Sequence, residues 1–290
     1  MAGTLKFAGS SADFLSAKFV IFGVPFDSTT SFRSGQRFAP NRIREASATL
    51  ERFIYGNNVN IKEAKVHDIG DLGSTVLPKV MVDNVSEMVN KIITENKFPI
   101  MLGGEHSVTI GVGDAIKKKD VAVLFLDAHP DFRDKLLDQK LSHGSVAKRM
   151  VEKIGIERAG AIGIRSVSFE EDSDPLFKKY AYYTTDQVRE KGVRATLQEF
   201  LRKIRSRKVY LSLDLDVMDP AFAPGVSTPE PFGIDPFQVK EIIHLIGKRM
   251  VGADIVELDP PYDNGNTAIL AARFVQEIIA SVVKAQTQPG

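Results

Sequence analysis

The sequence predicts an α/β fold built on a mostly parallel sheet. Short apolar runs rich in Val, Ile, Leu and Phe recur along the 290-residue chain. Between them lie segments with the periodicity of amphipathic helices, about 3.6 residues. Several runs are apolar at successive positions, as expected for strands that helices cover on both faces. Repeated alternation of strand and helix favours parallel strands with helices on both faces of the sheet.

The predicted elements follow one another from end to end. The strand-like runs are residues 19–25, 65–69, 99–102, 121–126, 160–164, 209–214 and 254–258. The predicted helices are residues 40–52, 80–95, 146–154, 235–248 and 267–283. Pro40 stands in the first turn of its helix, where proline is favourable. No internal repeat or convincing linker interrupts the pattern, so we expect a single domain over residues 1–290.

The composition argues against several classes of partner. With 38 basic and 37 acidic residues the net charge is +1, which gives no electrostatic reason to expect nucleic acid or an anionic membrane. No secretory signal is evident in residues 1–16, and no apolar run approaches the roughly 20 residues that span a bilayer. The chain has no cysteine, which fits a cytoplasmic location. Any metal must therefore be held by histidine and carboxylate side chains.

Residues of metal-ligating type follow three predicted strands. Residues 103–107 (GGEHS) follow the predicted strand at 99–102, and residues 127–131 (DAHPD) follow the strand at 121–126. Residues 214–220 (DLDVMDP) begin at the last residue of the strand at 209–214. In such sheets the functional site lies at the carboxyl ends of the strands. We therefore expect these three segments to meet.

The spacing of these residues predicts a metal centre. In extended chain, residues i and i+2 point to the same side, so Asp127 projects with His129 and Asp214 with Asp216. Asp131 joins the first pair if the extension persists. Converging carboxylates repel one another unless cations neutralise them. With His106, four Asp and two neutral His match two divalent ions and a bridging hydroxide.

Asp219 and the remaining histidines each have a structural interpretation beside a functional one. An Asp after a strand is usually a cap or turn residue, and we expect this of Asp219. His67, in a strand-like run, and His244, in a helical pattern, are predicted to be structural. His143 lies in a polar loop before the helix at 146–154, where capping does not explain it. Its natural pKa suits a general acid or base near neutral pH.

Together these motifs resemble those of the ureohydrolase family, the arginases, agmatinases and their relatives. The matching segments are 103–107, 127–131, 142–144, 212–225 and 228–230 (TPE). Segments 23–27, 37–40 and 257–263 are similar to those of agmatinases. The resemblance implies a three-layer α/β/α fold with an eight-stranded sheet. It also implies two metal ions, usually manganese, and a homo-oligomer, often a trimer or hexamer.

The resemblance also implies a role for each site residue. The metal ligands would be His106, Asp127, His129, Asp131, Asp214 and Asp216. Such ligands suit manganese and leave zinc, cobalt and iron open. The reaction is hydrolysis of a guanidine to urea and an amine, in which two metals lower the pKa of a bridging water. Asp131 would orient the resulting hydroxide, Glu230 would pair with the guanidinium, and His143 would pass a proton to the departing amine.

The substrate is predicted from the absence of a segment that arginases use to bind arginine. Arginases typically hold the α-carboxylate and α-amine of arginine with a Ser-Gly-Asn segment before the loop histidine, but residues 136–142 here read LLDQKLS. Agmatine lacks the carboxylate, so we expect agmatine, with putrescine and urea as products and a place in polyamine biosynthesis. Arginine and guanidinobutyrate are the alternatives. The sequence departs from common family patterns at Glu105, Pro130 and residues 226–227, the last in a loop that would line the substrate pocket.

Three other functions were considered. A one-zinc amide deacetylase would need fewer ligands than the six present. A two-metal phosphoesterase would need phosphate-binding groups, and no Gly-rich loop followed by Lys is found. A non-catalytic assembly subunit would have lost a ligand, His143 or Glu230, and none is lost.

Overall fold

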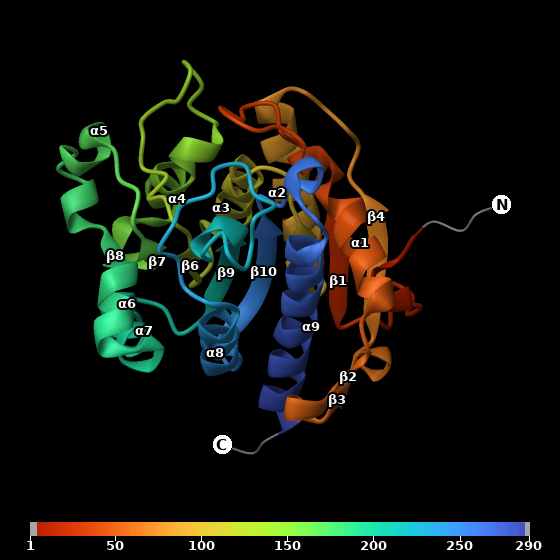
Figure 1. The fold of residues 1–290 in the computed structure, drawn as a ribbon. Coiled ribbons are helices and arrows are strands. Elements are labelled where there is room, and N and C mark those ends of the chain that lie inside the picture. The colour runs from red at the N-terminus through yellow and green to blue at the C-terminus, as the bar shows by residue number, and fades with distance from the viewer. Residues whose placement is uncertain (1–4, 288–290) are drawn as a thin grey trace.

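The computed structural model describes residues 5–287, and its centre is one sheet of eight parallel strands. The strand order is β4-β1-β5-β10-β9-β6-β7-β8, and every neighbouring pair is parallel. The strands are β1 (Phe19–Gly23), β4 (Val66–Asp71), β5 (Phe98–Leu102), β6 (Ala122–Leu126), β7 (Ala159–Ile164), β8 (Ala181–Thr184), β9 (Val209–Asp214) and β10 (Met250–Val256). A short antiparallel hairpin lies outside the sheet, formed by β2 (Phe53–Ile54) and β3 (Val59–Asn60). The predicted fold class is confirmed (Figure 1).

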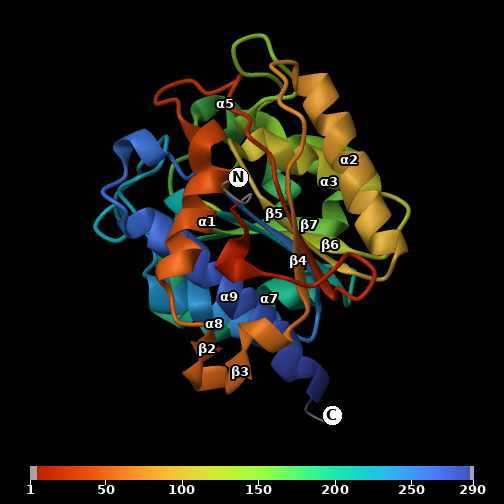
Figure 2. The ribbon, with the colours of Figure 1, turned by 90° about the vertical axis from the view of Figure 1, so that its right-hand side faces the viewer.

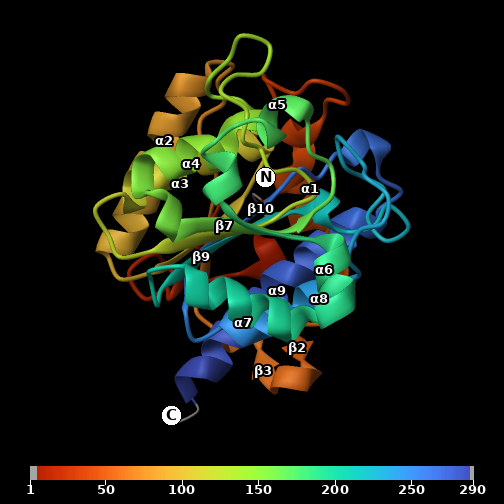
Figure 3. The same ribbon diagram turned by 90° about the vertical axis from the view of Figure 1, so that its left-hand side faces the viewer.

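Helices cover both faces of the sheet and make three layers (Figures 2 and 3). They are α1 (Ala39–Thr49), α2 (Pro78–Thr94), α3 (Ile110–Ile116), α4 (Val146–Ile154), α5 (Phe169–Asp172), α6 (Thr185–Lys191), α7 (Val193–Lys203), α8 (Pro236–Ile246) and α9 (Asn266–Thr287). One apolar core joins the sheet to α1, α7, α8 and α9, and a second joins it to α2, α3 and α4. The central strands β5, β6 and β9 are buried along their whole length, which explains their continuous apolar runs.

Helices α2 and α8 show local features that favour helix formation, some of which were not used to predict them. In α2, Pro78 stands in the first turn, and Val82, Val85, Val89 and Ile92 are buried on one stripe. Helix α8 begins with a capping box in which Asp235 accepts from the backbone of Gln238. Among residues 5–287 no helix is both long and apolar enough to cross a bilayer.

Sequence patterns missed some elements. Strand β8 has four residues, lies at the edge of the sheet and is only partly buried, so it lacks a strong apolar run. The short helices α3, α5, α6 and α7 were also not predicted. The predicted strand at 254–258 begins earlier and ends at Val256, so Glu257 lies in the connection that follows it.

A buried ion-pair network holds α1 against the edge strand β4. The side chain of Arg44 is 1% exposed, and its Nε donates to Asp68 Oδ2 at 2.8 Å. Its Nη1 donates to Asp71 Oδ1 at 2.5 Å. The network offsets the cost of burying the guanidinium, so removal of one partner is costly.

We expect Asp68→Ala to lower the free energy of unfolding by about 3–5 kcal/mol, because it leaves the Arg44 charge buried beside a weaker partner. Chemical denaturation measures this. The control is Asp83→Ala, which breaks the exposed Lys79–Asp83 pair and should change the value by less than about 1 kcal/mol. Equal effects of the two variants would contradict the role of the network.

Candidate active site

The candidate active site lies where four adjacent central strands end. β5, β10, β9 and β6 are neighbours in the sheet, so their carboxyl ends form one edge. His106 follows β5, Glu257 follows β10, Asp214 is the last residue of β9, and Asp127 follows β6. The three segments predicted to meet do meet.

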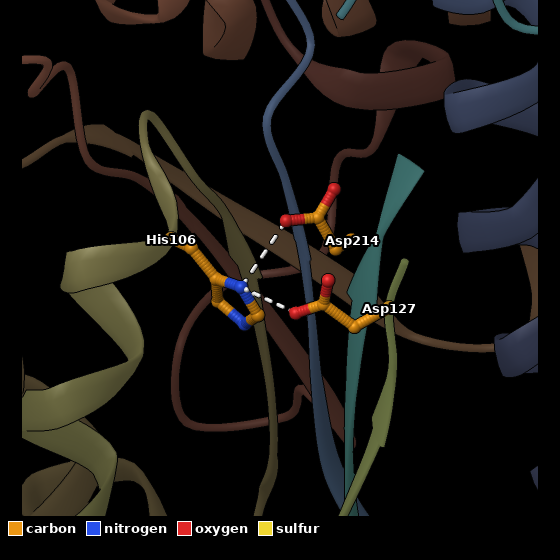
Figure 4. Close-up of side chains that lie close together, drawn as sticks. All are labelled: His106, Asp127 and Asp214. Carbon is orange, nitrogen blue, oxygen red and sulfur yellow. Dashed lines mark ion pairs between the residues drawn. The ribbon is translucent and has the colours of Figure 1, made fainter. Parts of the chain in front are cut away.

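His106 Nδ1 is at the centre of the first group of ligands. It lies 3.1 Å from one carboxylate oxygen of each of Asp127, Asp131 and Asp214. Figure 4 shows two of these carboxylates turned toward the ring. Nδ1 is buried and has no hydrogen-bond partner. Ligands about 2.1 Å from one ion and at right angles to each other lie about 3.0 Å apart, so this spacing fits one divalent cation.

A second group of ligands adjoins the first. His129 Nδ1 lies 2.9 Å from Asp216 Oδ2 and 3.9 Å from Asp127 Oδ1. These three residues can offer ligand atoms that all lie within 4.8 Å of one another. Asp127 belongs to both groups, so two cations held here would share it. All six predicted ligands are therefore brought together, in an arrangement that can hold two ions.

Backbone N–H groups orient three of the carboxylates. Asp127 Oδ1 accepts from His129 N at 2.6 Å, Asp214 Oδ1 from Asp216 N at 2.9 Å, and Asp216 Oδ1 from Ala128 N at 3.0 Å. One oxygen of each carboxylate is thus fixed by the main chain. The second oxygen of each, Oδ2, faces a ligating histidine.

The chain does not stay extended through the ligand segments as predicted. Asp131 has a φ of 48°, in the left-handed region that non-glycine residues rarely adopt. Asp216 lies in the 3-10 turn Leu215–Val217. Both still reach the site because these turns bend the chain over the sheet edge. Left-handed backbone at such residues clusters at functional sites.

The electrostatics of the cluster favour cations. Burial and then the charge of Asp127 raise the pKa of Asp131 to about 7. Burial and then Asp216 raise the pKa of Asp214 well above its usual range. Burial lowers the pKa of His106, but the surrounding carboxylates outweigh this and raise it well above its usual value. The cluster therefore retains protons when no cation is bound, and divalent ions can replace them.

A buried polar chain holds the far side of the His106 ring. Nε2 lies 3.1 Å from Ser212 Oγ, whose hydroxyl donates to Asp254 Oδ1 at 2.6 Å. Thr109 Oγ1 donates to the other oxygen of Asp254 at 3.1 Å. If Nε2–H donates to Ser212, Nδ1 is left unprotonated toward the carboxylates, as a metal ligand requires. We did not predict Asp254, whose only signal was one acidic residue in an apolar strand.

His143 lies in the same cavity, on the loop before α4. Its Nε2 is 3.1 Å from Ser31 Oγ, and its backbone N donates to Thr29 Oγ1 at 3.1 Å. The Thr29 hydroxyl in turn donates to Glu105. Burial first, and the positive charge of His129 second, lower the pKa of His143 to about 4. The imidazole is therefore neutral near pH 7.

Close packing at Gly104 brings the segment of Thr29 and Ser31 to this site. A Cβ at Gly104 would lie 1.9 Å from the backbone oxygen of Phe26. The same oxygen accepts from Glu105 N at 2.8 Å. Glycine at this position thus permits the chain after β1 to approach the end of β5.

Glu230 is held beside the second ligand group. Its Oε1 accepts from Ser166 Oγ at 2.8 Å and lies 3.4 Å from His129 Nε2. Arg165 anchors both sides of this contact, because its Nη2 donates to the backbone oxygens of Asp216 at 2.6 Å and Glu230 at 2.8 Å. We did not predict Arg165, because these two backbone partners lie more than 50 residues away from it in the sequence.

The cavity has a volume of about 300 Å³, and Glu257 lines it together with five of the predicted ligands and His143. Glu257 has a φ of 66°, and its Oε1 accepts from His106 N at 2.6 Å. Burial and then the charge of Glu105 raise its pKa well above its usual range. We placed Glu257 in a family-like segment but predicted no role for it.

The residues predicted to be structural lie outside this cavity. His67 Nδ1 is 2.7 Å from the backbone oxygen of Ala12, and His244 Nε2 is 2.8 Å from Glu277 Oε2. Asp219 accepts from the backbone of Ala221 and Phe232, as a turn residue does.

Comparison with known proteins agrees with this geometry. The model of the arginase family matches residues 17–281. An agmatinase from Halalkalibacterium halodurans is 37% identical over 94% of this chain and 95% of its own length. A guanidinobutyrase from Pseudomonas aeruginosa is 34% identical over 92% of this chain and 86% of its own length. The crystal structure of agmatine ureohydrolase of Thermoplasma volcanium is 41% identical, with a TM-score of 0.93, and the match covers 97% of this chain and 95% of that one.

We expect Asp127→Ala to lose bound metal and to abolish turnover, because this carboxylate belongs to both ligand groups. Metal content per chain and urea release measure the two effects. The control is Asp186→Ala on the exposed side of α6, and this variant should keep both its metal content and its turnover. A variant at Asp127 that retains full activity would overturn the ligand assignment.

Proposed function

The chain belongs to the arginase family, and we propose that it hydrolyses agmatine to putrescine and urea. The observation that carries the proposal is the meeting of the six predicted ligands in two groups that share Asp127, with Asp131 joined to the first group through its contact with His106, in a cavity that His143 also lines. Enzymes of this family depend on a pair of metal ions.

We propose that both ions are manganese. His106, Asp127, Asp131 and Asp214 would hold the first, and His129 and Asp216 with the shared Asp127 would hold the second. Carboxylate oxygens with two imidazoles are suitable ligands for manganese. When bound, the ions would offset the carboxylate charge and lower the pKa of water in the site.

Glu230 is proposed to bind the substrate guanidinium. A planar guanidinium presents several N–H donors in one plane, which suits a carboxylate acceptor. Ser166 and the Arg165 anchor hold the Glu230 carboxylate beside His129, so the bound guanidinium would lie next to the second ligand group. Glu257, whose Oε1 accepts from His106 N, lines the same cavity and would supply a second acceptor.

Asp131 and His143 are proposed to handle the protons. Water adds to the guanidine carbon, and the C–N bond to the alkyl amine breaks. The Asp131 carboxylate would accept a hydrogen bond from the attacking water and so orient it. The neutral His143 imidazole would take up a proton that the attacking water loses, and Nε2 would pass it to the amine nitrogen as the C–N bond breaks. Ser31 Oγ, 3.1 Å from Nε2, keeps the ring turned toward the cavity.

Three further features are proposed from the family resemblance and the composition. The family resemblance supports a homo-oligomer, as a trimer or hexamer. The absence of cysteine supports a cytoplasmic location. The near-neutral net charge supports a small guanidine as the partner and not nucleic acid or an anionic membrane.

Urea release from the manganese-loaded protein tests the proposal, with agmatine, arginine and guanidinobutyrate compared side by side. We expect the highest kcat/KM for agmatine. A preference for guanidinobutyrate, which the Pseudomonas aeruginosa relative makes the second candidate, would keep the reaction and change the substrate. No urea from any of the three with two metals bound would refute the proposed reaction.

We expect His143→Ala to lower kcat by about 100-fold or more, because positioned proton transfer typically contributes a factor of this size. Metal content should not change, since His143 belongs to neither ligand group. His67→Ala, which removes a histidine outside the cavity, should leave turnover unchanged. Loss of metal from the His143 variant would disprove the proton-transfer role.

A further inference from the structure

One part of the cavity wall is formed by residues that hold no metal. The loop after β6 contributes Arg133 and Leu136, the segment leading into α5 contributes Val167 and Ser168, and α5 itself contributes Glu171. Both segments lie along the upper edge of the molecule in Figure 1. We call this part the distal wall, because a substrate whose guanidinium binds Glu230 would extend its other end away from the ligand groups.

The charged side chains of the distal wall are few. Arg133 is the one Lys or Arg that lines the cavity among the described residues. Its Nη1 lies 3.5 Å from Glu170 Oε2, and the two side chains are 33% and 59% exposed. At this exposure and length the pair is weak, so neither charge is fully neutralised by the other.

Glu171 adds a second carboxylate to the distal wall. It is 4% exposed, and its oxygens accept from Phe132 N at 2.9 Å and from Ser168 Oγ at 2.7 Å. Within the described part of the chain it has no ion-pair partner. Glu170 does not line the cavity, but it pairs with Arg133; counted with it, two carboxylates against one guanidinium leave this side of the cavity with one net negative charge.

We propose that Arg133, Glu170 and Glu171 select the charge at the far end of the substrate. This inference rests on the proposed guanidine hydrolysis. The net negative wall attracts an ammonium, as in agmatine, and repels a carboxylate, as in guanidinobutyrate. Leu136 and Val167 line the same cavity and provide apolar contact for the methylene chain between the two ends. Arg133 sets the limit of this preference, since it is the one group on the wall that favours a carboxylate.

Substitutions of Arg133 and of Glu170 should change the substrate preference in opposite directions. Glu170→Gln leaves Arg133 without its partner, so the ratio of kcat/KM for agmatine to kcat/KM for guanidinobutyrate should fall by about 3- to 10-fold. Arg133→Gln removes the positive charge, so the same ratio should rise by about 3- to 10-fold. Glu170→Gln removes one charge with little change in size, whereas Arg133→Gln removes one charge and also shortens the side chain.

Asp172→Asn is the matched control. It removes a negative charge from the exposed end of α5 at a residue that does not line the cavity, and the ratio should stay within about twofold of the unmodified protein. Each ratio is measured as urea release from the manganese-loaded full chain. A nonspecific disturbance of the loops would change the kcat/KM ratio in the same direction in the Glu170 and Arg133 variants. Opposite changes of the ratio would therefore indicate selection by charge.

The outcomes separate this inference from the proposed function. Absence of urea from both guanidines in the unmodified protein would refute the proposed function. Urea release with ratios that do not shift, or that shift in the same direction in both variants, would overturn the role of the distal wall and leave the hydrolysis intact. A preference of the unmodified protein for guanidinobutyrate would also overturn it, because a net negative wall cannot produce that preference.

Discussion

The mutual repulsion of four aspartates at one edge of the sheet is the constraint on which the site depends. Asp127, Asp131, Asp214 and Asp216 are nearly fully buried within reach of two histidines. Such a cluster is stable only when protons or cations neutralise it. The raised pKa values of Asp131 and Asp214 show the demand for positive charge. Two divalent ions, as proposed, would meet this demand and would supply the chemistry of guanidine hydrolysis.

The scaffold around this cluster is organised to keep it rigid. Backbone N–H groups fix one oxygen of Asp127, Asp214 and Asp216. Arg165 ties the backbone of Asp216 to that of Glu230, so the proposed guanidinium acceptor and the metal centre share one anchor. Metal ligands depend on such supporting contacts for their orientation and affinity. Sites built in this way keep their geometry when a flexible substrate enters.

The cavity divides into a reactive end and a distal wall with different physical demands. At the reactive end, buried charges and tight hydrogen bonds fix atoms for bond breaking. At the distal wall, the partly exposed charges of Arg133 and Glu170 act over longer distances and are screened by water. Preference among linear guanidines can therefore change through a few surface charges while the metal centre stays the same. This separation fits a family in which relatives named agmatinase and guanidinobutyrase are similarly related to this chain.

Sequence alone determined the fold class and all six proposed ligands, because strand alternation and the Asp127-x-His129 and Asp214-x-Asp216 spacing are local patterns. It did not reveal β8, whose partly exposed residues carry no apolar run. Nor did it give roles to Arg165, Asp254 or Glu257, whose partners are distant in sequence. The left-handed turn at Asp131 and the Arg133–Glu170 contact arise when separate loops pack over one sheet edge. Such contacts between loops depend on the path of the whole chain, and only the tertiary structure decides them.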